Sequence, residues 1–189
     1  MKNEVLKVIS DRRSHRAYKA EQLQEEALKA ILQAGLEAPS ATNRQPWHYT
    51  VVQDAALLQA IHDEAGRVFA GGDPKRTARF EEGTFQMFYH APTVIFLFGE
   101  KDFGWTAVDC GIAVQNMALA AESLGIGSVI LGMPKAAFQG ERGDELRACL
   151  KCPEGSDFVI AIALGYATDD KAPHDLRPEK ISYIPERKA

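Results

Sequence analysis

The sequence has little of several features that mark special classes of protein. Its three cysteines among 189 residues are too few for a disulfide framework, and they favour a reducing cytoplasm. No apolar run approaches the ~20 residues that a membrane-spanning helix needs, and no secretory signal is predicted. The net charge of -4 lacks the basic excess of most nucleic-acid-binding proteins. We therefore expect a cytoplasmic protein with neither a membrane nor a nucleic-acid partner.

Common catalytic and metal-binding motifs are also absent. The five histidines are scattered without metal-ligand spacing, and the pair Cys149 and Cys152 lacks the two further ligands of a zinc site. There is no phosphate loop with its lysine and no strand-serine-helix nucleophile motif. We therefore predict no metal site. The lack of an obvious general acid or base fits an enzyme whose chemistry belongs to a cofactor.

What is present is the composition of an ordinary globular domain, 46% hydrophobic and 25% charged, and we expect one domain over residues 1–189. Apolar residues at helical spacing predict helices over 21–37 and 105–124. Continuous apolar runs predict buried strands over 93–98 and 158–164. Because the strands are few and the helices many, the pattern indicates an α+β fold or a three-layer α/β/α sandwich.

Two segments are harder to interpret. In the segment 66–90, which follows no clear pattern, Phe80, Phe85, Phe88 and Tyr89 are either anchors to the core or a mobile cover for a site, and we favour anchors. The extension 169–189 cannot form a core of its own. It either lies on the domain or crosses to a partner chain.

A polar loop connects the first long helix to the next strand, over residues 38–47. Pro39 and Pro46 fix the backbone at two points, and the residues between them carry short hydroxyl and amide side chains, those of Ser40, Thr42, Asn43 and Gln45. Such a loop suits a ligand that is rich in hydrogen-bonding groups and poor in charge, such as a flavin, a base or a sugar. The alternative is a structural turn with local side-chain caps.

A basic island stands in an otherwise acidic chain at residues 12–19. Its guanidinium groups, on Arg12, Arg13 and Arg16, repel one another and gain most from a shared anion, and arginine suits bidentate phosphate contacts. Phosphate binding competes here with a solvated basic loop, or with one that is bridged to scattered acidic residues.

Polar residues and a glycine mark the predicted core. Asp109, Gln115 and Asn116 interrupt a helix that is otherwise apolar nearly all round, and buried polar groups need partners, so we expect them to bind backbone or a ligand. Gly132 follows a short apolar strand, where a backbone can come close to a ligand.

Taken together, these segments resemble the flavin-dependent nitroreductase family. Residues 12–16 are similar to its Arg-x-Ser-x-Arg/Lys element, and residues 38–47 match its Ala-Pro-Ser-x-x-Asn-x-Gln-Pro-Trp element nearly residue for residue. Residues 109–132 resemble its long central helix and the glycines that follow, and residues 164–166 match the Gly-Tyr close of its last strand. The segment 66–90 lies outside the resemblance.

The resemblance implies a three-layer sandwich with a central mixed sheet flanked by helices, in a homodimer with a domain-swapped tail and two FMN sites at the interface. It implies that the basic island holds the FMN phosphate and the adjoining flavin edge, through Arg12, Arg13, Ser14 and Arg16. The polar loop would reach the flavin from the other subunit, through Pro39, Ser40, Ala41 and Asn43, with help from Gln45.

The resemblance also assigns the remaining parts of the site. Ile130, Leu131 and Gly132 would lie at the flavin, with the Gly132 amide near its reactive nitrogen. Arg177 would contact phosphate, although Asp175 stands where the family often has a lysine. Trp105 and Asp109, together with residues 80–89, would wall the substrate pocket.

The implied function is an FMN-dependent oxidoreductase that uses NAD(P)H to reduce nitroaromatic, quinone or related electrophilic acceptors by ping-pong hydride transfer. Within the same family, the alternatives are a flavin or enone reductase and a dehalogenase. From another class, the alternative is a flavin-binding sensor without turnover.

Overall fold

The computed structural model describes residues 3–70, 78, 80 and 82–184. The helices are α1 (Glu4–Asp11), α2 (Glu25–Leu36), α3 (Ala55–Ala70), α5 (Thr106–Ser123) and α6 (Gly143–Cys149), and the short 3-10 helices are η1 (Ala41–Asn43), η2 (Met133–Gln139) and η3 (Pro178–Lys180). The strands are β1 (Trp47–Val52), β2 (Thr93–Glu100), β3 (Gly127–Leu131) and β4 (Ser156–Gly165). Among the described residues, no helix is both long and apolar enough to cross a membrane.

The four strands form one sheet in the order β1-β2-β4-β3. Every pairing between these strands is antiparallel, so the prediction of a mixed sheet was wrong for this chain. The reason lies in the connections: β2 begins beside the end of β1, with Val52 opposite Val94, so the chain re-enters the sheet at the end that it has just left. In the part of the chain that the structure describes, the parallel contact is an isolated bridge between Ser14 and Ser128.

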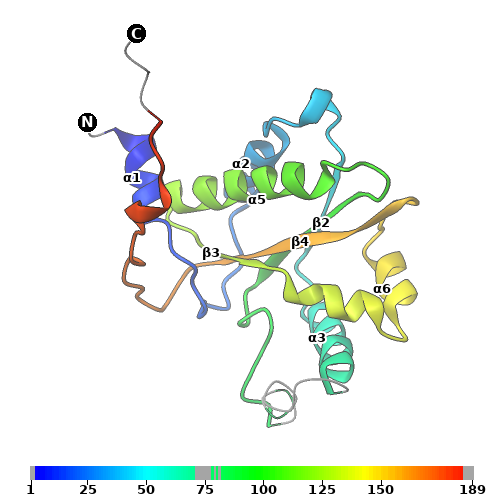
Figure 1. Ribbon diagram of the computed structural model, residues 1–189. Helices are drawn as coiled ribbons and strands as arrows, with labels where there is room; N and C mark the ends of the chain where they lie inside the picture. Colours follow the sequence, from blue (N-terminus) through cyan, green and yellow to red (C-terminus); the bar gives the residue numbers. More distant parts are fainter. Residues whose placement is uncertain (1–2, 71–77, 79, 81, 185–189) are drawn as a thin grey trace.

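Helices cover both faces of this sheet (Figure 1), which confirms the α+β three-layer sandwich. Strand β2 is buried from Thr93 to Gly99, as its continuous apolar run predicted. Phe96 and Phe98 point into one cluster with α3 and η2, whereas Ile95 and Leu97 point into the other with α2 and α5. Because successive side chains of a strand point to opposite faces of the sheet, β2 contributes to both hydrophobic cores.

The second core depends on a close approach of α2 to α5. A side chain at Gly35 would collide with Met117, so glycine lets the two helices meet. Asn116 Nδ2 donates to the Ala34 carbonyl (3.1 Å), and Tyr49 Oη donates to the Gly35 carbonyl (2.9 Å). The expected backbone partner of Asn116 is confirmed.

The helix predicted from residue 21 begins only at Glu25, because the Gln22 side chain instead donates a hydrogen bond to the Pro92 carbonyl (2.9 Å).

The aromatic residues before β2 are anchors where the structure describes them. Phe85 and Phe88 are buried in the first core, and the Phe80 ring stacks on His62 at 4.8 Å between ring centroids. The preference for anchors over a cover is confirmed for these residues. The stretch 71–77 and residues 79 and 81, which belong to the same predicted segment, lie outside the described residues.

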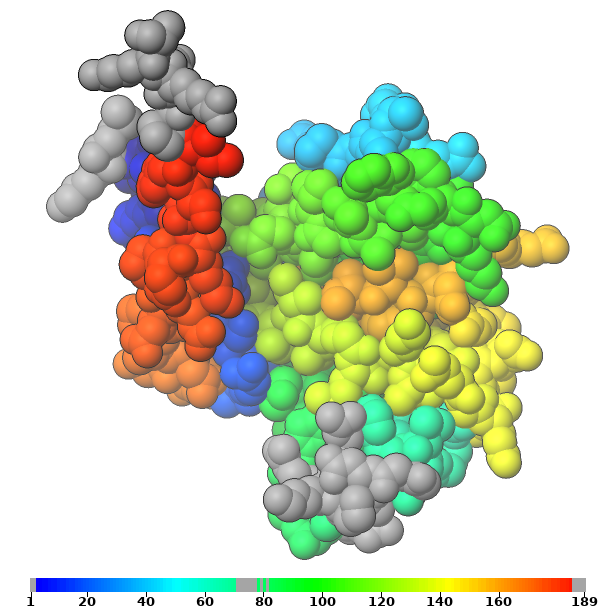
Figure 2. All heavy atoms as spheres, viewed as in Figure 1, coloured from blue at the N-terminus to red at the C-terminus, as the bar shows by residue number. Residues whose placement is uncertain are grey.

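The tail first lies on the domain and then leaves it. Residues 166–168 pair with 17–19 through hydrogen bonds from Lys19 N to the Tyr166 carbonyl and from Thr168 N to the Ala17 carbonyl, both 2.9 Å. From residue 172 to residue 184 every side chain is exposed. Figure 2 shows this part, in red, along one side of the molecule.

The edge-to-face aromatic rings of the first core generate a prediction about stability. Phe96 is fully buried and meets Phe88, Phe138 and Phe158 edge-on. Replacement Phe96→Ala should lower the free energy of unfolding by about 3–5 kcal/mol, because it leaves a cavity in a closely packed core. Phe96→Leu should cost clearly less. Urea denaturation measures both, and equal losses would contradict this packing.

Candidate functional site

The basic island is fixed to the edge of the sheet. Ser14 forms a bridge with Ser128 on β3, and the His15 amide donates to the Ser128 carbonyl (3.0 Å). Tyr18 Oη donates to the His15 carbonyl (2.7 Å). The island is therefore an ordered segment rather than a solvated loop, and it lies against the strand that leads to Gly132.

The three arginines of the island have different surroundings. Arg13 donates to backbone carbonyls of Ser10 (2.6 Å), Arg12 (2.9 Å) and Lys171 (3.2 Å). Arg16 lies over the Tyr89 ring, with its guanidinium carbon 5.9 Å from the ring centroid. The Arg12 guanidinium has no hydrogen-bond or ion-pair partner among the described residues. Within the described part of the chain the Arg12 guanidinium is thus unpaired although its residue is half-buried, whereas Arg16 is exposed and Arg13 joins the tail to the end of α1.

The carboxylate of Asp169, at the beginning of the tail, contacts the basic island. Asp169 Oδ1 lies 2.8 Å from His15 Nδ1, and Asp169 Oδ2 accepts from the Arg16 amide (2.9 Å). Lys171 Nζ also lies 3.3 Å from Asp169 Oδ2. Burial disfavours the charged carboxylate, but the hydrogen bonds from Arg16, His15 and Lys171 outweigh it and hold the pKa of Asp169 below its ordinary value.

Gly132, at the end of β3, leaves open space in front of the sheet. Its φ of -90° is ordinary for any residue, so no left-handed conformation requires glycine there. A Cβ built at Gly132 would meet only Ile160 Cδ1, at 4.0 Å. Leu131 is buried and Ile130 is half-buried. Gly132 therefore exposes its backbone to anything that lies over this end of the sheet.

The polar loop is braced by its own side chains, as its composition suggested. Ser40 Oγ accepts from the Gln45 amide (2.9 Å), and Gln45 Nε2 donates to Asn43 Oδ1 (3.1 Å). Arg44 forms an ion pair with Glu100, with Nη2 and Oε2 2.6 Å apart. Pro39 and Pro46 flank these contacts. The loop is held rigidly against the start of α5 and the end of β2.

Backbone strain in this loop was not visible in the sequence. Thr42, Asn43 and Gln45 have φ of 54°, 55° and 51°, in the left-handed region that non-glycine residues seldom occupy. Such positions cost of order 1–3 kcal/mol each and persist where the surroundings fix them. Strain of this kind clusters at ligand-binding segments, which supports the ligand interpretation over a simple structural turn.

Asp109 connects the loop to α5. Its carboxylate is buried, and both oxygens lie 3.2 Å from the Ala41 amide nitrogen, which donates to them. This satisfies the expectation that Asp109 would find a backbone partner. Its other predicted role, as a wall of the substrate pocket, stays a prediction. Trp105, the other predicted wall residue, is well exposed one turn earlier in the chain.

Within one chain, the loop and the basic island lie at opposite ends of α5 (Figure 1). The loop contacts Asp109 in the first turn. Helix α1, which ends at the island, instead packs near Leu119, Ala120 and Ser123. Asp109 and Ser123 are separated by fourteen residues, which corresponds to roughly 21 Å of helix. The structure therefore places the island against the beginning of β3, the strand that leads to Gly132, and places the loop at the other end of α5.

Comparison with known proteins agrees with the motifs. The model of the nitroreductase family matches residues 9–166. The chain belongs to the nitroreductase family.

Similar structures extend this family assignment over nearly the whole chain. A nitroreductase with bound FMN from Desulfitobacterium hafniense DCB-2 has 39% identity and a TM-score of 0.92, and the match covers 98% of this chain and 100% of that one. A nitroreductase with bound FMN from Bacteroides fragilis NCTC 9343 has 32% identity and a TM-score of 0.91, with 97% and 100% covered. The FMN reductase [NAD(P)H] of Bacillus subtilis is 30% identical over 94% of this chain and 72% of its own length.

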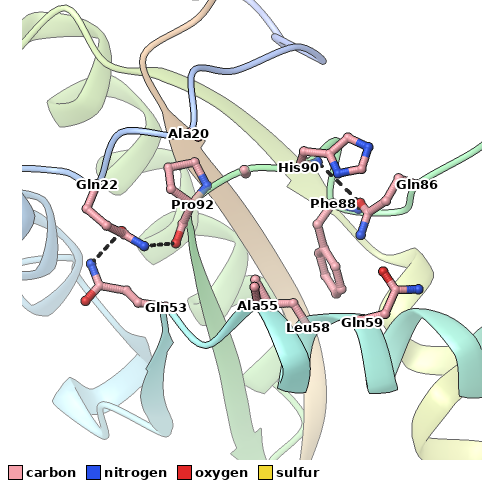
Figure 3. A pocket seen from close by; sticks show the side chains of 11 residues that line it. Ala20, Gln22, Gln53, Ala55, Leu58, Gln59, Gln86, Phe88, His90 and Pro92 are labelled. Carbon is pink, nitrogen blue, oxygen red and sulfur yellow. Dashed lines mark hydrogen bonds between the residues drawn. The ribbon is translucent and has the colours of Figure 1, made fainter.

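The nitroreductase-family chain also has a cavity away from these elements. It measures about 280 Å³ and lies between the start of α3 and the segments around Gln22 and residues 86–92 (Figure 3). The Gln53 amide donates to the Gln22 side chain (3.0 Å), so part of its polar lining is internally paired. The cavity takes no residue from the basic island, the loop or the end of β3, and so it is separate from the candidate site.

Two features of the site escaped the sequence analysis. His15 and Asp169, which join the island to the tail, are separated by more than 150 residues, and no local pattern marks such a pair. The ion pair between Arg44 and Glu100 also joins residues that are far apart in sequence, 56 positions in this case. Arg177 was predicted from the family, and the structure places it in the exposed tail, where its side chain has no hydrogen-bond or ion-pair partner among the described residues.

The unequal surroundings of Arg12 and Arg13 lead to a prediction. Arg13→Ala should lower the free energy of unfolding by about 1–3 kcal/mol, because the carbonyls of Ser10, Arg12 and Lys171 lose a charged donor. Arg12→Ala removes the same charge without such contacts and should change stability by less than about 0.5 kcal/mol. Urea denaturation of both variants without added ligand is the measurement. A larger loss for Arg12→Ala would show that the roles are reversed.

Proposed function

We propose that this protein is an FMN-dependent oxidoreductase that uses NAD(P)H to reduce nitroaromatic, quinone or related electrophilic acceptors. Support comes from the family membership, from FMN-bound neighbours at up to 39% identity and from a relative named for FMN reduction with NAD(P)H. Bound FMN would supply hydride transfer in two half-reactions, ping-pong fashion. The cytoplasmic location stays a prediction from the sequence.

The residues present fit a flavin phosphate at the island. Arg12 is an available cation, the Ser14 hydroxyl can donate to an anion, and Arg16 is held over Tyr89. A phosphate bound by Arg12 and Arg16 would accept charge-assisted hydrogen bonds, while Arg13 keeps its backbone partners and adds positive charge nearby. The isoalloxazine ring of the flavin could then lie along β3, where Gly132 leaves space. Arg177 would complete the phosphate contacts from the tail.

The observation that carries the proposal is the position of the loop relative to the island. Within one chain the loop contacts the first turn of α5, whereas α1, which ends at the island, packs near the last turn, roughly 21 Å further along the helix. A second copy of the chain can bring its own loop to the first copy's island. We therefore propose a homodimer with two composite sites, in which Pro39, Ser40, Ala41, Asn43 and Gln45 come from the partner.

The apolar surface of the chain supports self-association. The exposed large apolar side chains gather on α1 and the tail and at the ends of α2 and α5, namely Val5, Leu6, Ile9, Leu36, Trp105, Val108, Leu124, Leu176, Ile181, Tyr183 and Ile184. Tyr183 is 86% exposed and Ile184 is 95% exposed, which is unusual for large apolar residues at the end of an ordered tail. We propose that this tail crosses onto the partner in the homodimer.

In this arrangement the chain itself binds and orients rather than reacts. The island supplies positive charge at the phosphate, and the braced loop supplies hydrogen-bonding groups in a fixed position. Asp109 keeps the loop in place through Ala41. Trp105 offers an exposed aromatic face near the same loop, suited to stacking on a planar acceptor.

Cofactor content and turnover test the proposed activity directly. The purified protein, or protein incubated with FMN, should be yellow, should bleach with NADH or NADPH, and should oxidise the nicotinamide repeatedly when a nitroaromatic is present. A single bleaching without turnover would indicate a sensor. Protein that no added FMN turns yellow would reject the proposal outright.

The composite site predicts complementation between two defective chains. Arg12→Ala/Arg16→Ala removes the island, and Ser40→Ala/Asn43→Ala weakens the loop, so each variant alone should bind little FMN. A heterodimer of the two, purified through different affinity tags, contains one site made from two intact segments. It should bind about half the FMN of the wild-type dimer. If each site lay within one chain, the heterodimer would bind no more than the two variants alone.

A further inference from the structure

We propose that Asp169 is a positioning residue for the phosphate end of the cofactor site. It acts through His15 and Arg16 rather than by touching the ligand. This inference rests on the proposed function, because it concerns how the basic island is prepared for FMN.

The geometry of Asp169 suits a clamp. Its two oxygens are used on different groups: Oδ1 faces the His15 ring at 2.8 Å, and Oδ2 accepts the Arg16 amide at 2.9 Å. The His15 and Asp169 side chains are mostly buried, with 16% and 17% of their surface exposed. The carboxylate therefore fixes the main chain of the island between two of its functional positions, Ser14 and Arg16.

The same carboxylate orders the beginning of the tail. Asp169 follows the short ladder between 17–19 and 166–168 and pairs with Lys171. The Lys171 carbonyl in turn accepts from Arg13 Nε (3.2 Å). One acidic side chain thus connects the island to the tail in front of Arg177.

The packing around His15 leaves little freedom for other arrangements. A side chain at Gly127 would come within 2.7 Å of the Ala167 Cβ and 3.2 Å of the His15 ring. The absence of a side chain at Gly127 lets His15 and the tail lie together on the edge of β3. Asp169 then closes over His15 from the tail side.

The charge of Asp169 makes its role testable. A negative group this close to a phosphate site opposes anion binding, so charge alone predicts that its removal tightens FMN binding. Positioning predicts the opposite, because the Arg16 amide and the His15 ring lose their partner and the island loosens. The two explanations therefore differ in sign.

Asp170 provides a matched control. It is exposed, has no hydrogen-bond or ion-pair partner among the described residues, and carries the same charge one residue later. Asp169→Asn and Asp170→Asn can be compared in the full-length chain. The dissociation constants of FMN and of riboflavin, which lacks the phosphate, are measured for each by flavin fluorescence.

We expect Asp169→Asn to weaken FMN binding by about tenfold, with riboflavin changed less than about twofold, and Asp170→Asn to change neither by more than about twofold. A loss shared equally by FMN and riboflavin would indicate general destabilisation and would overturn the proposal. So would FMN binding by Asp169→Asn that equals or exceeds that of Asp170→Asn. Wild-type protein that fails to bind FMN would instead reject the proposed function itself.

A second variant keeps the proposal testable if Asp169→Asn does not fold. Asp169→Glu keeps the charge but moves the carboxylate by one methylene, so it cannot serve His15 and the Arg16 amide in the same geometry. It should weaken FMN binding by a few-fold and change riboflavin binding less. Unchanged FMN binding in a folded Asp169→Glu variant would show that position at this residue does not matter.

Discussion

The attachment of the basic island to the edge of β3 is the contact on which the candidate site depends. Main-chain hydrogen bonds at Ser14 and His15 place three arginines beside the strand that ends at Gly132. Without it, the island would be a charged loop whose guanidinium groups move apart in solvent. With it, a positive cluster and an open stretch of backbone lie on one edge of a rigid sheet.

The polar loop obeys a different constraint. Three of its residues adopt left-handed backbone conformations, which a free segment would abandon. They are retained because three contacts fix the loop. Asp109 accepts a hydrogen bond from the Ala41 amide, Ser40 accepts one from the Gln45 amide, and Glu100 forms an ion pair with Arg44. The loop is thus rigid before any ligand arrives, which reduces the ordering cost of binding.

Sequence patterns predicted the parts of this molecule that depend on local periodicity. The buried strands, the long helix α5 and the α+β layering follow from apolar runs and helical spacing, and the two candidate ligand-binding segments were recognisable because their residue types are unusual together. The antiparallel pairing of every strand was missed, because the direction of a strand depends on the end of the sheet at which a long connection brings the chain back. The clamp formed by His15 and Asp169 was missed for the same reason: its two halves meet only in the folded chain. The delayed start of α2 reflects the competing contact of Gln22 with the Pro92 carbonyl.

The separation of the island and the loop along α5 has a consequence for gene dosage. If each cofactor site needs two chains, the amount of loaded enzyme follows the concentration of paired chains, and it rises more steeply than the amount of polypeptide synthesised. Below the dissociation constant of the dimer, most chains would then be empty and unpaired. Abundant flavin, by binding only the pair, would shift that balance toward the assembled form.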